Sequence, residues 1–342
     1  MTRRSSSVSV TIRDVAKKAG VSVATVSRYI NRNTPVSPKV ARRLDKVMAK
    51  LKYVPHAAAR HLASRKTRLI GLLLTNIDND FFAPLLNGVE QIVRKEGYNL
   101  LVATYHSDNR DSVPPPIGPH NTDGLLVFAD SLPDEHLAKL HETGFPMVLI
   151  HRTPPASLPL PSVTVENKSA THRLVEHLIV QHNKRRILFL RGPMQQEDSY
   201  WRETGYRSAL EAHGIAFDEK LVLVGEFERE IAYNALNHFL RDGERVAFDA
   251  VFAGDDDAAI GVINALNEDG YRVPEDVAVV GFDDLRLSAF LTPPLTTVRA
   301  PTETVGRIAA ERLFGLLKNE ISEGVTLLPT EIIIRRSCGC NS

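Results

Sequence analysis

The stretch TIRDVAKKAGVSVATVSRYIN, residues 11–31, decides the fold of the N-terminal part of the chain. Its first half shows the i, i+3, i+4, i+7 spacing of one apolar helix face, through Ile12, Val15, Ala16 and Ala19. Gly20 suits the end of that helix because glycine accepts positive φ at low cost. Ser22 is a favoured residue to cap a second helix over residues 23–30. Two short helices joined by a three-residue turn predict a helix-turn-helix.

Cap signals also mark the first and third helices of this N-terminal unit. Thr11 and Asp14 stand three residues apart, as in a capping box with Asp in place of Glu. Ser37 and Pro38 predict the start of a third helix, since proline is favoured at the first helical position. The apolar face of that helix closes a small core with Val40, Leu44, Val47, Met48 and Leu51. Residues 9–55 are therefore predicted to form one all-α domain.

Charge is distributed unevenly along the chain. Up to Arg68 there are 17 Lys and Arg against two acidic residues, a balance of +15, whereas the remainder has a balance of −14. A basic N-terminal unit beside an acidic body is typical of a protein with a polyanionic partner. In helix-turn-helix proteins the second helix enters the major groove of double-stranded DNA. Residues 9–55 are thus interpreted as a DNA-binding headpiece; a basic bundle that binds protein fits the spacing less well.

The second helix carries side chains suited to reading DNA. Val23, Ala24 and Arg28 fall on its outer side, where Arg28 can pair with a guanine edge and Ala24 can touch a thymine methyl group. Short polar side chains suited to phosphate oxygens flank them, namely Ser22, Thr25, Ser27 and Asn31.

The next segment, YVPHAAARHL at residues 53–62, is short and alanine-rich. About eight residues are too few for a helix that is stable alone in water. A hinge helix over 56–66 that forms only on DNA fits this composition, with Leu62 as an apolar wedge in the minor groove. An ordinary interdomain linker is the alternative.

Residues 11–31, the Tyr53-Val-Pro tripeptide and the segment at 59–62 together resemble the lactose/galactose-repressor family of bacterial transcriptional regulators. In that family a hinge helix follows the headpiece, and its leucine kinks the centre of the operator. The resemblance therefore implies base reading by Val23, Ala24 and Arg28 and the wedge role of Leu62. Thr11, Tyr53 and Arg60 complete the predicted DNA contacts. The resemblance also implies a homodimer.

From Leu69 onward, short apolar runs alternate with amphipathic stretches, a pattern that predicts parallel sheets flanked by helices. The predicted strands are Leu69–Leu74, Leu100–Ala103, Gly124–Phe128, Met147–Ile150, Ile187–Leu190, Ala250–Phe252 and Val277–Gly281. The predicted helices are Leu85–Glu96, Asp134–Thr143, Ser169–Gln181, Thr204–His213, Ile231–Leu240 and Ala258–Asp269. The proline-rich segment Ser112–Pro119 is expected to be irregular, because prolines at that density break an interior helix.

The resemblance continues through phrases such as RETGY at 202–206, VPEDV at 273–277 and GFDD at 281–284. It implies a two-lobed α/β core related to periplasmic sugar-binding proteins, with crossings near Asn167, Arg299 and Pro329. The core is placed at 67–338. Its N-lobe spans 67–167 and 300–329, and its C-lobe spans 168–299 and 330–338.

Several core residues are candidates for effector contact, because ligands in such folds sit at the carboxyl ends of strands. Arg202 offers a rigid fork of donors, and Asp255 and Asp283 can accept from hydroxyls. Phe82 and Trp201 present flat faces to a ring. His151 stands where the family often has Asp, and Asp255 where it often has Asn. A helix cap or a surface role is the alternative for each acid.

Other chemistry finds little support in the sequence. No nucleophile elbow, phosphate loop or dinucleotide fingerprint is present, and the acids at 255–257 lack His or Cys partners at metal spacing. Cys338 and Cys340 are only two thiols, whereas a structural zinc site usually takes four ligands, so no metal or cofactor is expected. No apolar run reaches the ~18 residues of a membrane span. The N-terminus lacks the apolar centre of a secretory signal, which favours the cytoplasm.

The sequence thus predicts a repressor that binds a palindromic operator as a homodimer and responds to a small effector, a sugar or sugar derivative. A DNA-binding architectural protein without an effector and a carbohydrate-acting enzyme are the alternatives.

Overall fold

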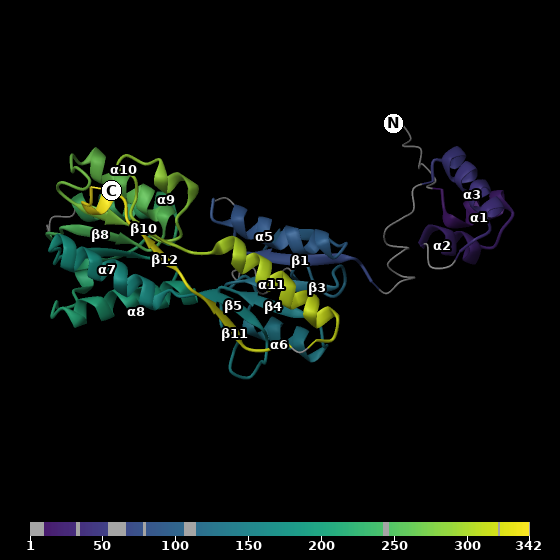
Figure 1. The fold of residues 1–342 in the computed structure, drawn as a ribbon, viewed down its shortest axis with the longest axis horizontal. Coiled ribbons are helices and arrows are strands. Elements are labelled where there is room, and N and C mark those ends of the chain that lie inside the picture. Colours follow the sequence, from purple (N-terminus) through teal and green to yellow (C-terminus); the bar gives the residue numbers. More distant parts are fainter. Residues whose placement is uncertain are drawn as a thin grey trace, which may run out of the picture. The chain divides into compact units, whose positions relative to one another are not determined.

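The structure is a computed structural model that describes residues 10–31, 35–53, 66–77, 80–105, 114–241, 246–320 and 322–341. The chain divides into two units, Met1–Thr67 and Arg68–Ser342. Figure 1 draws the first unit in purple and the second from blue to yellow. The predicted hinge residues Arg60 and Leu62 lie outside the described residues. Within these ranges, none of the helices has the length and apolarity needed to cross a membrane.

The headpiece has the three helices that its cap signals predict: α1 (Ile12–Ala19), α2 (Val23–Asn31) and α3 (Pro38–Leu51). The Asp14 carboxylate accepts from the Thr11 backbone N–H at 2.8 Å and from its hydroxyl at 2.7 Å. Gly20 ends α1 at φ 61°, and the Thr25 N–H donates to the Ser22 hydroxyl at 3.1 Å. The buried centre consists of Val15, Ala16, Ala19, Val26 and Leu44.

The N-lobe is built on a six-stranded parallel sheet in the order β11-β5-β4-β3-β1-β2. Its strands are β1 (Leu69–Leu74), β2 (Asn99–Thr104), β3 (Gly124–Phe128), β4 (Met147–Ile150), β5 (Ser162–Val165) and β11 (Val325–Leu328). One face packs against α5 (Phe82–Lys95) and α11 (Thr302–Leu317), which lie side by side in Figure 1. The other face packs against α6 (Asp134–Glu142).

The C-lobe is built on a four-stranded parallel sheet in the order β7-β6-β8-β9. Its strands are β6 (Ile187–Arg191), β7 (Val222–Val224), β8 (Ala250–Ala253) and β9 (Ala278–Val280). The helices α7 (Lys168–His182) and α8 (Glu197–Ala212) cover one face. The helices α9 (Arg229–Arg241) and α10 (Asp256–Glu268) cover the other.

Three segments carry the chain between the lobes. The first passes from β5 to α7 through Asn167, and the second leaves β10 (Thr297–Arg299) for α11. The third runs from β11 to β12 (Glu331–Ile333), which pairs antiparallel with β10. Figure 1 shows the yellow β11–β12 segment passing from one lobe to the other. The predicted fold class, a helix-turn-helix headpiece with a two-lobed core of parallel sheets, is confirmed.

The proline-rich segment forms no helix over its described residues 114–119. Ile117 nevertheless is buried in the apolar cluster on the α6 side of the sheet. It occupies the space over Gly71, where a Cβ would come 2.3 Å from the Ile117 Cγ2 atom. The Asn121 side chain holds the loop by donating to the Pro116 carbonyl oxygen at 2.8 Å and accepting from the Gly118 N–H at 3.0 Å. The segment therefore covers the sheet with a loop side chain.

Candidate functional site

The headpiece presents the predicted reading side chains to solvent. Val23, Ala24 and Arg28 of α2 are all exposed, while Val26 between them is fully buried. The exposed Ser22 caps α2 through its hydroxyl. Thr11 is also exposed and takes part in the α1 cap. Tyr53 packs against the headpiece core, which gives it a structural role in addition to the predicted DNA contact.

Arg202 of α8 lies at the centre of a buried polar network in the core and is only 2% exposed. Its guanidinium donates to Asn167 Oδ1 at 2.9 Å, to the Gly254 carbonyl oxygen at 2.6 Å and to Asp283 Oδ1 at 3.2 Å. The guanidinium carbon also lies 3.8 Å from the centre of the Phe282 ring, close enough for a cation–π contact. The network fixes the position of this charge at the carboxyl ends of β8 and β9.

A second buried pair joins the two lobes. The Nδ1 atom of His151, which follows β4, lies 2.7 Å from Oδ2 of Asp198 on α8. Asn167 Nδ2 donates to the other Asp198 oxygen at 2.7 Å. Burial alone would raise the pKa of Asp198, but the charge of His151 and its hydrogen bond, and then Arg202, lower that pKa overall. Asp198 is therefore held as a carboxylate between the lobes.

The three consecutive acids at 255–257 have three different roles. Asp255 caps α10, because its carboxylate accepts from the Ala258 N–H at 2.8 Å. Asp257 forms an ion pair with Arg229 at 2.7 Å. Asp256 is fully buried and accepts from one backbone N–H and two hydroxyls, those of Leu285, Ser288 and Thr297. These acids do not converge on one point, so the triplet does not form a metal site or a catalytic pair.

Burial raises the pKa of Asp256 to about 7, although the hydrogen bonds that its carboxylate accepts lower it. Between the ordinary Asp pKa and pH 7 the folded state thus binds a proton that the unfolded state releases. The stabilisation from this proton is complete below about pH 4 and is lost as pH rises through 7, at up to about 1.4 kcal/mol per pH unit.

We expect Asp256→Asn to gain stability relative to the unsubstituted protein as pH rises from 5 to 8. The amide mimics the neutral carboxyl, so its contribution does not depend on pH. Urea unfolding of both proteins at several pH values checks this, and parallel stability curves would contradict it.

A small inner cavity of about 60 Å³ lies between the lobes, next to the polar network around Arg202. Its polar lining includes Arg202, Asp198, Asp255 and Asp283, and its aromatic lining consists of Phe81, Phe82, Phe128 and Phe227. Burial, followed by the neighbouring Asp283, raises the pKa of Asp255 well above its usual range. Burial also raises the pKa of Asp283. The two carboxyls consequently retain protons to higher pH than isolated ones, which suits them to bind hydroxyl groups.

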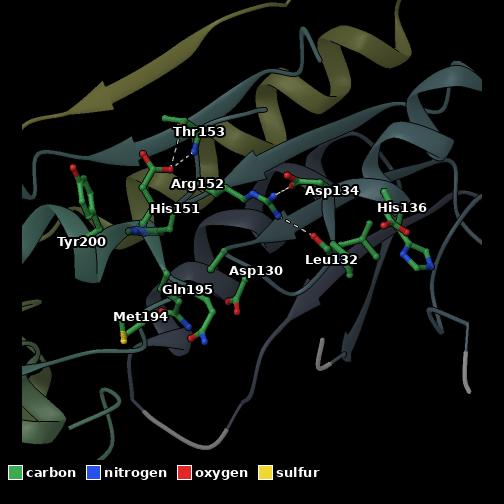
Figure 2. A pocket seen from close by; sticks show the side chains of 15 residues that line it. Asp130, Leu132, Asp134, His136, His151, Arg152, Thr153, Met194, Gln195 and Tyr200 are labelled. Carbon is green, nitrogen blue, oxygen red and sulfur yellow. Dashed lines mark hydrogen bonds and ion pairs between the residues drawn. The ribbon is translucent and has the colours of Figure 1, made fainter. Parts of the chain in front are cut away.

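A larger outer pocket of about 740 Å³ opens beside the inner cavity, and Gln196 lines both. Figure 2 shows the outer pocket between the Asp130–His136 and His151–Thr153 segments and the Met194–Tyr200 segment. The Thr153 N–H and hydroxyl both donate to Glu197 on α8, at 2.5 and 2.9 Å. The pocket is within the usual size range for small-molecule sites.

Four buried polar atoms around these spaces have no hydrogen-bond partner among the described residues: Asn76 Oδ1, Asp130 Oδ1, His136 Nδ1 and His151 Nε2. Buried polar atoms in native structures almost always have a partner, so an unpaired cluster needs an explanation. All four atoms belong to side chains that line the inner cavity or the outer pocket. A ligand with several hydroxyl groups would satisfy them.

Comparison with known proteins agrees with this architecture. Residues 11–56 match the model of bacterial regulatory proteins of the lacI family, and residues 175–338 match a periplasmic binding protein-like domain. The chain is 30% identical to catabolite control protein A of Priestia megaterium, over 96% of this chain and 99% of that protein. The chain belongs to the LacI family. This LacI-family protein is also 34% identical to the transcriptional regulator GalR of Escherichia coli K12, over 95% and 94% of the two chains.

Solved structures of LacI-family proteins share the fold. The complex of the regulator CelR with cellobiose matches with a TM-score of 0.70 at 30% identity, over 96% of this chain and 99% of that one. The lac repressor dimer bound to operator and the anti-inducer ONPF matches with a TM-score of 0.77 at 25% identity, over the same shares. The protein is accordingly a DNA-binding transcriptional regulator with a ligand-binding core.

The structure brings together most of the predicted effector contacts of this LacI-family regulator. Phe82, Arg202, Asp255 and Asp283 line the inner cavity, and His151 lines the adjoining outer pocket. Trp201 instead lines a third pocket beside β5 and β11, which shares Thr153 and Glu197 with the outer pocket, and its indole N–H donates to Glu197 at 2.9 Å. The helix expected to begin at Thr204 begins at Glu197, so Trp201 and Arg202 point in different directions from one helix.

Sequence reasoning did not single out most of the residues that line the inner cavity, among them Asn76, Asp198 and Phe227. Asn76 and Phe227 follow β1 and β7, so the rule that ligands sit at the carboxyl ends of strands applies to them. The three-residue strand β7 was not predicted, which concealed Phe227. Asp198 lies in the first turn of α8, before the stretch predicted to be helical.

Proposed function

We propose that this regulator binds a palindromic operator as a homodimer in the cytoplasm, and that an uncharged, sugar-like effector in the cleft between its lobes controls that binding. The observation that carries the effector proposal is the set of unpaired buried atoms on Asn76, Asp130, His136 and His151. They belong to the linings of two adjoining spaces between the lobes, one of them large enough for a sugar.

The charges around the cleft favour a neutral ligand. Besides the carboxyls of Asp255 and Asp283, whose pKa is raised, the inner cavity holds the acids Asp198 and Glu226 against one guanidinium, that of Arg202. The outer pocket adds four acids, Asp130, Asp134, Glu135 and Glu197, and the one guanidinium of Arg152. An anionic ligand such as a sugar acid or a sugar phosphate would face this acidic excess. The carboxyls and aromatic rings suit a polyhydroxylated ring, and CelR, a relative in fold and sequence, was solved with cellobiose.

The homodimer proposal rests on the family and on an exposed apolar patch. Leu287 and Phe290, in and after the short helix η3 (Arg286–Ala289), are 42% and 82% exposed. Large apolar side chains of this kind are buried in homodimer interfaces. A dimer presents two headpieces to the two half-sites of a palindrome. The wedge role of Leu62 is proposed from the family resemblance alone.

Arg28→Ala should lower affinity for a palindromic site selected from random DNA by roughly 10- to 100-fold, because a guanine contact contributes about 1–3 kcal/mol of discrimination. Arg43→Ala is the control, since it removes one exposed charge from α3. The two variants should lose similar affinity for unrelated DNA, and Arg28→Ala should lose more affinity for the selected site. Fluorescence anisotropy at several salt concentrations measures both affinities. Equal losses of affinity for the selected site in the two variants would contradict base reading by Arg28.

The same assay tests the effector proposal with a panel of neutral sugars, sugar acids and sugar phosphates. A neutral sugar should change operator affinity, whereas the anionic compounds should not. A response only to anions would contradict the argument from charge. Operator binding that no compound changes would favour the alternative of an architectural DNA-binding protein.

A further inference from the structure

The C-terminal end of the chain lies against α7 and brings four metal-binding side chains together. His177 and His182 come from α7, and Cys338 and Cys340 from the last residues of the chain. One nitrogen or sulfur atom of each lies within 4.8 Å of all the others. The Cys340 Sγ atom is 3.6 Å from His177 Nε2 and 3.3 Å from His182 Nε2. This cluster shares no residue with the lining of the inner cavity or the outer pocket.

The backbone around the two cysteines is shaped to bring both thiols to this point. The short helix η4 (Arg336–Cys338) ends at Gly339, whose φ of 106° favours glycine. A Cβ at Gly339 would also come 3.1 Å from the His182 ring. Ser337 anchors the turn, since its hydroxyl donates to the Val279 carbonyl oxygen at 2.6 Å and accepts from the Thr296 N–H at 2.8 Å.

We propose that His177, His182, Cys338 and Cys340 bind one Zn²⁺ ion in a structural site of two thiolates and two imidazoles. A tetrahedral zinc ion with Zn–S bonds of about 2.3 Å and Zn–N bonds of about 2.0 Å separates its ligand atoms by about 3.3–3.8 Å. The two sulfur–nitrogen distances at Cys340 already fall in that range. Thiolates and imidazoles select zinc over calcium or magnesium, which prefer oxygen ligands.

The surroundings suit a closed structural site. Cys338 is buried, Cys340 is half-buried, and both pack with the apolar cluster between α7, α8 and the C-lobe sheet. Zinc binding replaces the two thiol protons, which pass to solvent. Within the described part of the chain, no other cluster of at least three such side chains has this geometry.

The zinc site would hold the end of the third crossing segment against α7 of the C-lobe. β12 returns the chain from the N-lobe, and the two cysteines follow it directly. The other end of α7 begins next to Asn167, which contacts Arg202. Zinc would therefore stabilise the folded C-lobe by mass action, as any ligand does that binds only the folded state.

The test is zinc binding by the full-length protein, purified with a thiol reductant and reconstituted with Zn²⁺ alone. We expect one zinc per chain by elemental analysis, and a higher unfolding temperature with zinc than after chelation. With Co²⁺ we expect visible bands of a tetrahedral ion together with thiolate-to-cobalt charge-transfer bands in the near ultraviolet. Zinc absent after reconstitution, or cobalt bands without the charge transfer, would overturn the proposal.

Cys340→Ser and His182→Gln should each weaken zinc binding by at least the roughly 10- to 100-fold that loss of a supporting group costs at a metal site. His238→Gln changes an exposed histidine on α9 and should bind zinc as the unsubstituted protein does. Operator binding by each variant reports whether it is folded. Unchanged zinc affinity in folded Cys340→Ser would overturn the proposal. So would a Cys338–Cys340 disulfide that forms equally fast with and without zinc, detected by counting free thiols.

Discussion

Arg202→Ala is expected to destabilise the core by about 3–5 kcal/mol and to abolish the response of operator binding to the effector. The guanidinium is buried and donates to Asn167, to the Gly254 carbonyl oxygen and to Asp283. Removing one partner of a buried ion pair leaves the other charge without compensation, which is the costly way to break such a pair. Asp283 would lose its cationic partner, and its pKa, which burial already raises, would rise further.

Two variants separate loss of charge from loss of geometry. Arg202→Lys keeps the charge but not the planar fork, so it should retain more stability than Arg202→Ala and still lose effector affinity. Arg207→Ala is the matched surface control, because Arg207 lies on the same helix and pairs with Glu203 in a half-exposed position. It should cost about 1 kcal/mol or less. Urea unfolding measures the stability of each variant, and fluorescence anisotropy measures its operator affinity with and without effector. An Arg202→Ala protein that is stable and responds normally to the effector would contradict the prediction.

The reason that Arg202 should affect the response lies in the connectivity of the polar network. Arg202 contacts Asn167 in the first crossing, Asn167 contacts Asp198, and Asp198 contacts His151 in the N-lobe. An effector that binds among these groups has different contacts when the lobes are open and when they are closed. Such differential contacts are what a ligand needs to shift a conformational equilibrium.

The elements that could be predicted from the sequence are those with strong local signals. The headpiece helices begin and end at cap residues, so α1 was predicted with both of its ends. The central strands β1, β3 and β4 are continuous apolar runs buried on both faces, and their bounds were predicted without error. Burial on both faces gives such strands their simple pattern in parallel sheets.

Most of the elements that were missed have weak or non-local signals. The strands β7, β10 and β12 have only three residues each, and their pairing depends on distant segments. α11 was missed although Val305, Ala309 and Leu313 recur at four-residue spacing, so its signal was present. The four-ligand cluster was invisible because α7 and the C-terminus meet only in the folded C-lobe.

The helices α5 and α11 pack in close contact. These helices touch through two glycines, because a Cβ at Gly88 would come 2.0 Å from the Glu303 carbonyl oxygen and one at Gly306 would come 2.4 Å from that of Leu85. Both obstacles are backbone atoms, which cannot rotate away as a flexible side chain can. An alanine at either position must push the helices apart and loosen the N-lobe core around them.

Gly306→Ala should therefore cost about 1–3 kcal/mol through overpacking, of which the higher helix propensity of alanine offsets about 1 kcal/mol. Gly315→Ala is the matched control, since it makes the same change on the same helix. There a Cβ would meet only the Glu320 side chain, at 3.3 Å. The control should gain up to about 1 kcal/mol from helix propensity. Urea unfolding midpoints compare the two, and a Gly306→Ala protein as stable as the control would show that the helices separate without cost.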